Sequence, residues 1–192
     1  MLSWQGGFIY IVNMKISSFF TLFILSSVSL TSCNKTAQSV PEFENLSPGQ
    51  SKFVVRLDDD FFYEDDAVFN GTCTVRDNFF GTNLFNQYGG NIMITFQEDK
   101  WYNKSYLEGE GGQTFSTLMI GKVIDKSKNL GAGYLMTEGK IFPKEVSKEK
   151  IYLEFEGKVK RYPKVDAQDP SYEVSGFLLM KSPDFTQYSV EE

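Results

Sequence analysis

Alternating apolar and polar positions recur along the chain from residue 52 onward. A β-strand with one buried face has this period of two, because successive side chains point to opposite faces of the sheet. The clearest example is IYLEFEGKVK, where every second residue from Ile151 to Phe155 is apolar, and a tyrosine and charged residues lie between and beyond them. The same alternation in KFVVRLD at 52–58 and NIMITFQ at 91–97 predicts two more half-buried strands.

Shorter apolar runs predict the remaining strands. They are TCTVR, TFSTLMIGKVI, LGAGYLMT and YEVSGFLLMKS, and turn sequences such as YGGN, GEGG and DAQDP separate them. Only FPKEVSKEK at 142–150 is expected to form a short helical turn. Short strands at regular spacing are typical of sandwiches and barrels. We therefore predict an all-β fold, a single antiparallel β-sandwich, with a lipocalin-like β-barrel as the alternative.

The last predicted strand lacks alternation, because GFLLM at 176–180 is apolar at consecutive positions. One explanation is a central strand that is covered on both faces. The other is a bulge at Gly176 that shifts the pattern by one residue. The sequence leaves both explanations open.

A different pattern marks the N-terminal part, where a continuous apolar run ends at a cysteine. Met14 and a lysine precede ISSFFTLFILSSVSL, a run of signal-peptide length that is too short for a comfortable membrane span. The run ends in LTSC at 30–33, which resembles the lipobox of bacterial lipoprotein signal peptides. The resemblance implies cleavage before Cys33 and its acylation. Two or more acyl chains anchor a protein stably, at about 0.8 kcal/mol per buried CH₂.

These features divide the chain into four parts. Residues 1–13 carry no positive charge, whereas a signal peptide begins with a basic region, so we interpret them as a mis-assigned start. The alternative is a genuine N-terminal extension. Residues 14–32 are the predicted signal peptide and 33–51 a lipidated flexible tether, whose last 18 residues would span roughly 23 Å as a flexible coil. Residues 52–192 are the predicted folded domain.

The strand pattern over residues 52–186 is similar to that of small β-sandwich lipoproteins common in Bacteroidota, and VSGFLLMKSP is its most specific part. The resemblance implies an outer-membrane location and brings no catalytic residues with it. In those bacteria an acidic stretch directly after the cysteine resembles a surface-export signal. NKTAQS has no acid before Glu42, so a periplasm-facing position is favoured.

The amino-acid composition excludes several classes of catalytic and binding site. The chain has no histidine, which removes the usual general base, the usual transition-metal ligand and every nucleophile pair that depends on histidine. Its net charge is −6, and no lysine or arginine cluster is available for phosphate contacts, so we expect no nucleic-acid partner. We expect no cofactor and no catalysis. Cys73 would have no partner once Cys33 is acylated, and we expect it to be a buried thiol.

Two acidic segments are candidates for metal binding or catalysis. DDDFFYEDD at 58–66 suggests calcium, but it does not match an EF-hand loop, and we expect a turn and a charged edge without a metal. Glu154 and Glu156 point the same way on one strand, about 7 Å apart, a separation that glycosidases use. Because two lysines continue the same face, we expect a solvated, salt-bridged surface there.

One segment combines aromatic residues with polar and flexible ones. WYNKSYLEGEGG at 101–112 contains Trp101, Tyr102 and Tyr106, and rings with hydrogen-bonding neighbours are used to bind sugars or peptides. A tryptophan near a strand end is more often an anchor in the core. The three aromatic residues are therefore the candidate ligand platform, with structural packing as the competing interpretation.

The sequence thus predicts a membrane-anchored lipoprotein of the bacterial envelope that acts as a non-catalytic binding or structural module. Its expected partners are the membrane, through the lipid anchor, and a glycan or protein of the envelope. A carrier of a small lipid or glycan, with a cavity inside a barrel, is the first alternative. A glycan-acting enzyme that uses carboxylates alone is the second.

Overall fold

The computed structural model describes residues 42–110, 116–163 and 168–190. Cys33, the predicted signal peptide and residues 1–13 therefore lie outside the described residues. The chain divides into two units, Met1–Ala37 and Gln38–Glu192, and every described residue belongs to the second. The whole cluster of buried side chains also lies within that unit, so it has a core of its own.

The second unit is all-β, as predicted. Its helical elements are short, α1 Glu42–Asn45 and the 3₁₀ helix η1 Trp101–Asn103. The strands are β1 Gln50–Leu57, β2 Asp60–Phe61, β3 Phe69–Arg76, β4 Phe79–Asn86, β5 Gly90–Phe96, β6 Leu107–Glu110, β7 Ser116–Asp125, β8 Leu130–Val146, β9 Lys150–Tyr162, β10 Ser171–Lys181 and β11 Asp184–Ser189.

The strands form one sheet that closes on itself. Antiparallel pairing runs in the order β3–β4–β5–β7–β8–β9–β10–β1, and β1 pairs in turn with β3 through Gln50 opposite Asn70 and Ser51 opposite Phe69. This contact makes an eight-stranded barrel. Beyond it β11 runs parallel to β3 and β2 pairs with the end of β1. The all-β expectation and the barrel alternative are therefore confirmed, whereas the two-sheet sandwich is not.

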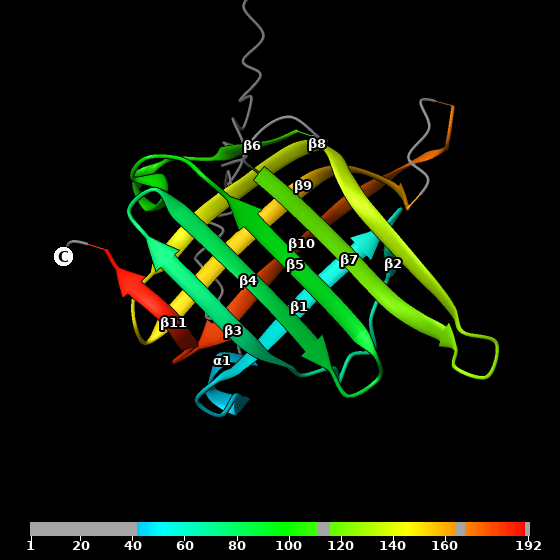
Figure 1. Ribbon diagram of the computed structural model, residues 1–192, viewed down its shortest axis with the longest axis horizontal. Helices are drawn as coiled ribbons and strands as arrows, with labels where there is room; N and C mark the ends of the chain where they lie inside the picture. The colour runs from blue at the N-terminus through cyan, green and yellow to red at the C-terminus, as the bar shows by residue number, and fades with distance from the viewer. Residues whose placement is uncertain (1–41, 111–115, 164–167, 191–192) are drawn as a thin grey trace, which may run out of the picture. The chain divides into compact units, whose positions relative to one another are not determined.

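The barrel has two faces whose strands cross each other. In Figure 1, β3, β4, β5 and β7 run across the front, and β9, β10 and β1 run behind them in a different direction, while β8 lies beside β7 in its first half and continues along β9. Each face has an inner and an outer side, which explains the alternation seen in the sequence. No helix among the described residues is long and apolar enough to cross a membrane.

Strand β8 corrects the expected helical turn at 142–150. The strand continues to Val146 and pairs with β9 along most of its length, while β7 pairs with its first half and β6 with its second. Pro143 is accommodated by an irregularity between Pro143 and Glu145 in the β8–β9 ladder. A proline lacks the N–H that a regular ladder uses, so a bulge is its usual place in a strand.

The N-terminal boundary also differs from the prediction. Residues 42–51, assigned to the tether, form α1, a turn and the start of β1. Leu46 is buried, and the Gly49 N–H donates to the carbonyl oxygen of Lys181. The fold therefore begins about ten residues before position 52.

The same region settles the question of the last apolar strand. β10 pairs with β9 and β1 without a bulge, so Gly176 does not shift the pattern. Leu179 is buried, yet it is absent from the interior cluster, and α1 contacts β10. We therefore interpret β10 as a central strand that is covered on both faces at this end.

Side chains fill the barrel interior. The buried side chains, from Phe53 on β1 to Met180 on β10, form one contiguous cluster. At each of the two ends of strands β3, β4 and β5, an aromatic ring from a connecting segment packs against this cluster. Tyr63, in the loop after β2, packs 5.1 Å from the ring of Phe69, measured between ring centroids. Trp101 packs 4.8 Å from the ring of Phe96 at the opposite end. Eight strands leave an interior that side chains can fill, and here they form a solid core.

Candidate functional site

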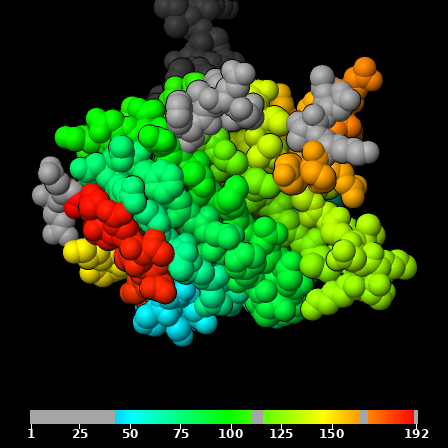
Figure 2. All heavy atoms as spheres, viewed as in Figure 1, coloured from blue at the N-terminus to red at the C-terminus, as the bar shows by residue number. Residues whose placement is uncertain are grey.

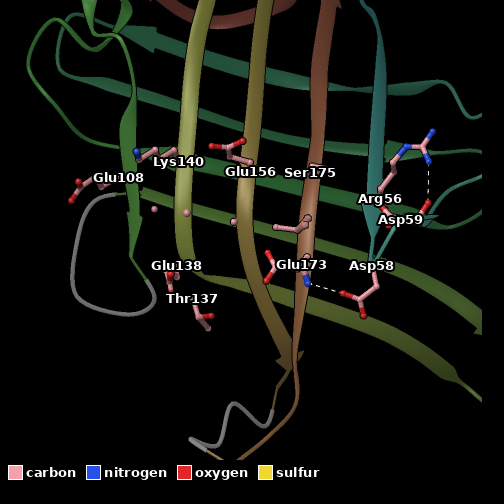
Figure 3. A pocket seen from close by; sticks show the side chains of 14 residues that line it. Arg56, Asp58, Asp59, Glu108, Thr137, Glu138, Lys140, Glu156, Glu173 and Ser175 are labelled. Carbon is pink, nitrogen blue, oxygen red and sulfur yellow. Dashed lines mark hydrogen bonds between the residues drawn. The ribbon is translucent and has the colours of Figure 1, made fainter. Parts of the chain in front are cut away.

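A broad groove lies on the outer surface of the barrel, across β6, β8, β9, β10 and the end of β1 (Figure 3). Its volume is about 1020 Å³. Because these strands bury their apolar residues on the inner side, the groove is lined by the polar side chains of the outer side. Its acidic residues are Asp58, Asp59, Glu108, Glu138, Glu156 and Glu173.

The groove is built on a row of directly opposed residues. Glu108 pairs with Lys140, Lys140 with Glu156, Glu156 with Ser175, and Ser175 with Arg56. Opposed residues on adjacent strands have neighbouring side chains, so charges of opposite sign along this row attract each other. The strand pairing therefore sets where each charged side chain of this row begins on the outer surface.

A second row lies two residues further along the strands. Glu138 pairs with Lys158, and Lys158 with Glu173. The Lys158 Nζ lies 3.5 Å from a Glu138 carboxylate oxygen. The backbone N–H of Glu173 donates to the Asp58 carboxylate at 2.8 Å, which connects the row to the end of β1.

Glycines between the two rows let the strands approach closely. Gly109, Gly139 and Gly157 are opposed across β6, β8 and β9. Gly139 and Gly157 have φ of 156° and 154°, values that other residues rarely adopt. A Cβ at Gly157 would overlap the carbonyl oxygen of Glu138, and one at Gly139 would overlap that of Glu156. The floor of the groove between the charged rows therefore consists of backbone.

The acidic segment 58–66 forms the turn that the sequence predicts. Asp58 and Asp59 have φ of 47° and 73° and connect β1 to β2 as a two-residue hairpin loop. Positive φ at both positions is the type I′ geometry, in which aspartate is favoured. The Arg56 guanidinium donates to the Asp59 carbonyl oxygen at 3.0 Å. Among the described residues, no group of three or more Asp, Glu or Cys side chains is arranged to hold a metal ion.

Electrostatically, the groove favours positive charge. Six carboxylates line it, together with the cationic side chains of Arg56 and Lys140, and Lys158 of the second row neutralises part of the negative charge through its ion pair with Glu138. Carboxylates accept hydrogen bonds and pair with ammonium or guanidinium groups. The arrangement is therefore suited to binding cationic groups over an extended surface.

Only one of the two candidate catalytic glutamates belongs to this groove. Glu156 lines it, whereas Glu154 accepts a hydrogen bond from the Tyr152 hydroxyl at 2.6 Å and lies 3.0 Å from the Lys144 ammonium. Burial, with the Glu154 carboxylate as a further cause, raises the pKa of Tyr152. The salt-bridged outer surface expected for this strand is what the structure shows.

The candidate aromatic platform does not form a single surface. Trp101 has 0% of its surface exposed, and its indole N–H donates to the carbonyl oxygen of Arg76 at 2.8 Å. Its ring lies 5.2 Å from that of Phe80, and it contacts Tyr102 at 5.8 Å between centroids. A fully buried ring offers no face to a ligand. The structure therefore corrects the platform interpretation of Trp101, which is a residue of the core.

The two tyrosines of the platform lie in different surroundings. Tyr102 is half-buried and donates to the Asp77 carboxylate at 3.1 Å. Tyr106 is exposed, with the Lys140 ammonium 4.4 Å from its ring centroid and the Phe142 ring 6.4 Å away. Tyr106 thus lies beside the groove through Lys140, and it is the one platform residue that remains accessible.

Cys73 is a free, buried thiol, as the sequence predicts. Burial raises the pKa of its thiol to about 12. Its thiolate, which would be the nucleophile, is therefore disfavoured at neutral pH. Burial also raises the pKa of the Tyr63 phenol, which hydrogen-bonds the backbone of Asn91 and Gly121.

Sequence reasoning missed most of the groove, although a signal was present. The tripeptide Glu-Gly-Lys occurs at 138–140 and again at 156–158. The two copies are antiparallel neighbours with Gly139 opposite Gly157, so each glutamate faces the lysine of the other copy. A repeated charged tripeptide around glycine indicates such a pairing, although the first copy, within TEGK at 137–140, was interpreted as a turn and is in fact part of β8. No comparable sequence repeat indicated that Arg56 or Glu173 would join the groove.

Comparisons with known proteins add no relative. No family model, no curated protein and no solved structure matches this chain.

Proposed function

We propose that this chain is a lipid-anchored, non-catalytic binding module of the bacterial envelope, and that the outer groove is its binding surface. The anchor is Cys33 in the lipobox-like LTSC segment, and the outer membrane, facing the periplasm, is the proposed location. The observation that supports the binding role is the groove of about 1020 Å³ outside a filled barrel. Loops and surfaces that a rigid β scaffold holds in place are where recognition residues concentrate.

The lining of the groove supports a cationic partner. Its carboxylates are held in cross-strand rows, so their positions are set before a partner arrives, which lowers the entropic cost of binding. The partner is a basic segment of an envelope protein or an amino-bearing glycan. Tyr106, above Lys140 at the edge of the groove, adds an exposed ring beside the charged rows.

Several observations support a role without catalysis. The chain has no histidine, and the Cys73 thiol is buried with its pKa raised to about 12. Glu154 pairs with Lys144, and only Glu156 of the predicted carboxylate pair lines the groove. A glycosidase needs both carboxylates on one substrate site.

The carrier alternative draws support from the closed barrel. Eight-stranded barrels enclose one small ligand in some protein classes. Here the Tyr63 and Trp101 rings and the cluster between them occupy the interior. A carrier role would require the 62–68 loop, which holds Tyr63, to move out, and we consider the outer groove the better-supported site.

The test uses residues 38–192 and a lysine-rich peptide as the probe. We expect salt-sensitive binding that weakens by more than tenfold when Glu156→Gln and Glu173→Gln are combined. The matched control removes the same charge elsewhere, through Glu98→Gln with Asp99→Asn, two acids beside a different surface. Equal weakening by both double variants would show unspecific attraction by net charge and would contradict the groove as the binding site.

The anchor is tested separately in the full chain. Cys33→Ala should leave an unprocessed precursor that takes up no labelled palmitate. Lipid incorporation by that variant would refute the proposed anchor without bearing on the groove.

A further inference from the structure

Exposed apolar side chains gather on two neighbouring hairpins. Of the eight large hydrophobic side chains exposed among the described residues, five lie on the β4–β5 and β7–β8 hairpins: Phe85, Tyr88, Val123, Ile124 and Leu130. The Val123 N–H donates to the carbonyl oxygen of Gly89 at 3.3 Å, which connects the two hairpins. Single exposed apolar residues are ordinary, whereas a concentration of them marks an interaction surface.

The β7–β8 hairpin projects from the barrel. Figure 1 shows its tip beyond the ends of the neighbouring strands, and Figure 2 shows the same tip projecting from the body of the molecule. Ile124 lies where the ladder shifts between Val123 and Asp125. Ile124 is 56% exposed and Leu130 is 48% exposed. Both aliphatic side chains are therefore accessible on a projecting element.

The hairpin carries positive charge in an acidic protein. Residues 122–130 contain three lysines and one aspartate, whereas the chain as a whole has a net charge of −6. The Lys122 ammonium donates to the Phe62 carbonyl oxygen at the barrel rim, so the cations of the tip are Lys126 and Lys128. The Lys128 side chain is 77% exposed, and its ammonium lies 3.2 Å from the Asp125 carboxylate, so this lysine is partly neutralised within the tip.

The single aspartate of the tip is part of the turn. Its carboxylate accepts hydrogen bonds from the Ser127 hydroxyl at 2.6 Å and from two backbone N–H groups. The Ser127 hydroxyl is the main cause that lowers the pKa of Asp125. Asp125 therefore holds the turn in one conformation and fixes how the lysines and aliphatic residues are presented.

The folded unit also begins at this edge of the barrel. Gln50, at the start of β1, is opposite Asn70 near the start of β3, and Phe69 is opposite Asn86 at the end of β4. In Figure 1, α1, the β4–β5 turn and the β7–β8 hairpin lie along the same lower edge. The side from which the chain enters the fold is thus the side that carries the apolar and basic tip.

We infer that the tip of the β7–β8 hairpin docks on the surface of an anionic phospholipid bilayer. Ile124 and Leu130 enter the headgroup–acyl boundary. The Lys126 ammonium pairs with a lipid phosphate, and the exposed Lys128 ammonium exchanges its ion pair with Asp125 for another. Combined apolar and basic residues are what membrane-surface elements use. The inference rests on the proposed function in one respect, because the lipid anchor brings the domain to a membrane.

The groove lies apart from the end of β1 at which the chain enters the fold. Arg56 and Asp58, which line the groove, are at the end of β1 opposite to the end where the chain enters. The acidic loop 64–66 adjoins the β4–β5 turn, where the Tyr88 hydroxyl donates to Asp66, so the β7–β8 tip makes the principal contact.

The experiment measures partitioning of residues 38–192, which lack Cys33, onto lipid vesicles by sedimentation. We expect binding to phosphatidylglycerol–phosphatidylcholine vesicles and much weaker binding to pure phosphatidylcholine. Ile124→Ser combined with Leu130→Ser should lower the partition coefficient at least tenfold, or about 1.4 kcal/mol. Lys126→Ser combined with Lys128→Ser should lower the partition coefficient on anionic vesicles about fivefold per lysine. The same double variant should leave partitioning onto neutral vesicles unchanged.

Matched controls lie elsewhere on the same domain. Phe61→Ser removes a ring that is 51% exposed, and Lys104→Ser removes a lysine paired with Glu98. Both controls should partition like the unmodified domain. Absence of binding to anionic vesicles, equal binding to neutral ones, or equal loss in the controls would overturn the inference.

One further outcome separates lipid from protein partners. If the unmodified domain ignores vesicles but forms a concentration-dependent dimer that the Ile124 and Leu130 substitutions abolish, the tip is a protein interface and the membrane inference fails. Residues 38–192 lack Cys33, so a negative vesicle result would refute the membrane docking of the hairpin and would not bear on the acylation of Cys33.

Discussion

The substitution Trp101→Ala tests the division between core and ligand surface. The indole is fully buried, and its rings contact Phe80, Phe96 and Tyr102. The substitution removes this packing and also the hydrogen bond from the indole N–H to the Arg76 carbonyl oxygen. Both losses act on the folded state, so the variant should be destabilised strongly.

The magnitude follows from known core truncations. Replacing a buried tryptophan by alanine costs about 3–5 kcal/mol, and the unpaired Arg76 carbonyl favours the upper part of that range. For a unit of this size, each kcal/mol lowers Tm by about 2–4 °C, so we expect a decrease of about 6–20 °C. Tyr102→Phe is the matched control, since it removes one half-buried hydrogen bond to Asp77 and should cost about 0.5–1.5 kcal/mol.

Urea unfolding of residues 38–192, followed by circular dichroism, measures the loss. The midpoint should fall in Trp101→Ala while the slope with denaturant stays constant, because the surface exposed on unfolding hardly changes. A loss below 1 kcal/mol would mean that the indole is not a core residue. It would also restore the aromatic platform as the candidate ligand site.

Three further predictions concern the core, the groove floor and the N-terminal segment. Because burial raises the pKa of Cys73 from 9.0 to about 12, only the unfolded chain ionises this thiol between those values. The free energy of unfolding should therefore fall with rising pH in that window, by up to about 1.4 kcal/mol per pH unit, and less steeply in Cys73→Val. Gly157→Val should abolish folding or lower the free energy of unfolding by more than about 3 kcal/mol, because its side chain would overlap the Glu138 carbonyl at a φ of 154°. Gly49→Ala, which has open space around a φ of 82°, should lower it by only about 1 kcal/mol. Thermal melts of both variants check this difference. Deleting residues 1–13 should leave membrane fractionation unchanged, and loss of export would show that the extension matters.

Local pattern predicted most strands but not their closure. The alternation in IYLEFEGKVK and NIMITFQ located β9 and β5, because each strand buries one face. β4, FFGTNLFN, was missed: phenylalanines on both faces break its alternation. The pairing of Ser51 with Phe69 closes the barrel. Nothing in the local sequence around either residue indicates which strand it pairs with.

The candidate site was predicted less well, for a physical reason. A groove formed across five strands depends on which strands are neighbours, and the sequence does not state that order. Glu156 was found because its own strand is strongly periodic, whereas Arg56 and Glu173 are brought to it only by the β9–β10–β1 pairing. Trp101 was a candidate platform residue because polar residues surround it in sequence, with core packing as the competing interpretation; η1 turns its ring into the core.

The lipid anchor is tested most directly by the intact mass of the mature protein, expressed from the full chain and extracted from bacterial membranes with detergent. We predict a chain that begins at Cys33 and carries the added mass of several acyl groups on that residue. The same measurement on Cys33→Ala should show the unprocessed precursor with no added mass. A mature protein that lacks acyl groups, or one cut at another position, would contradict the lipid-anchored module.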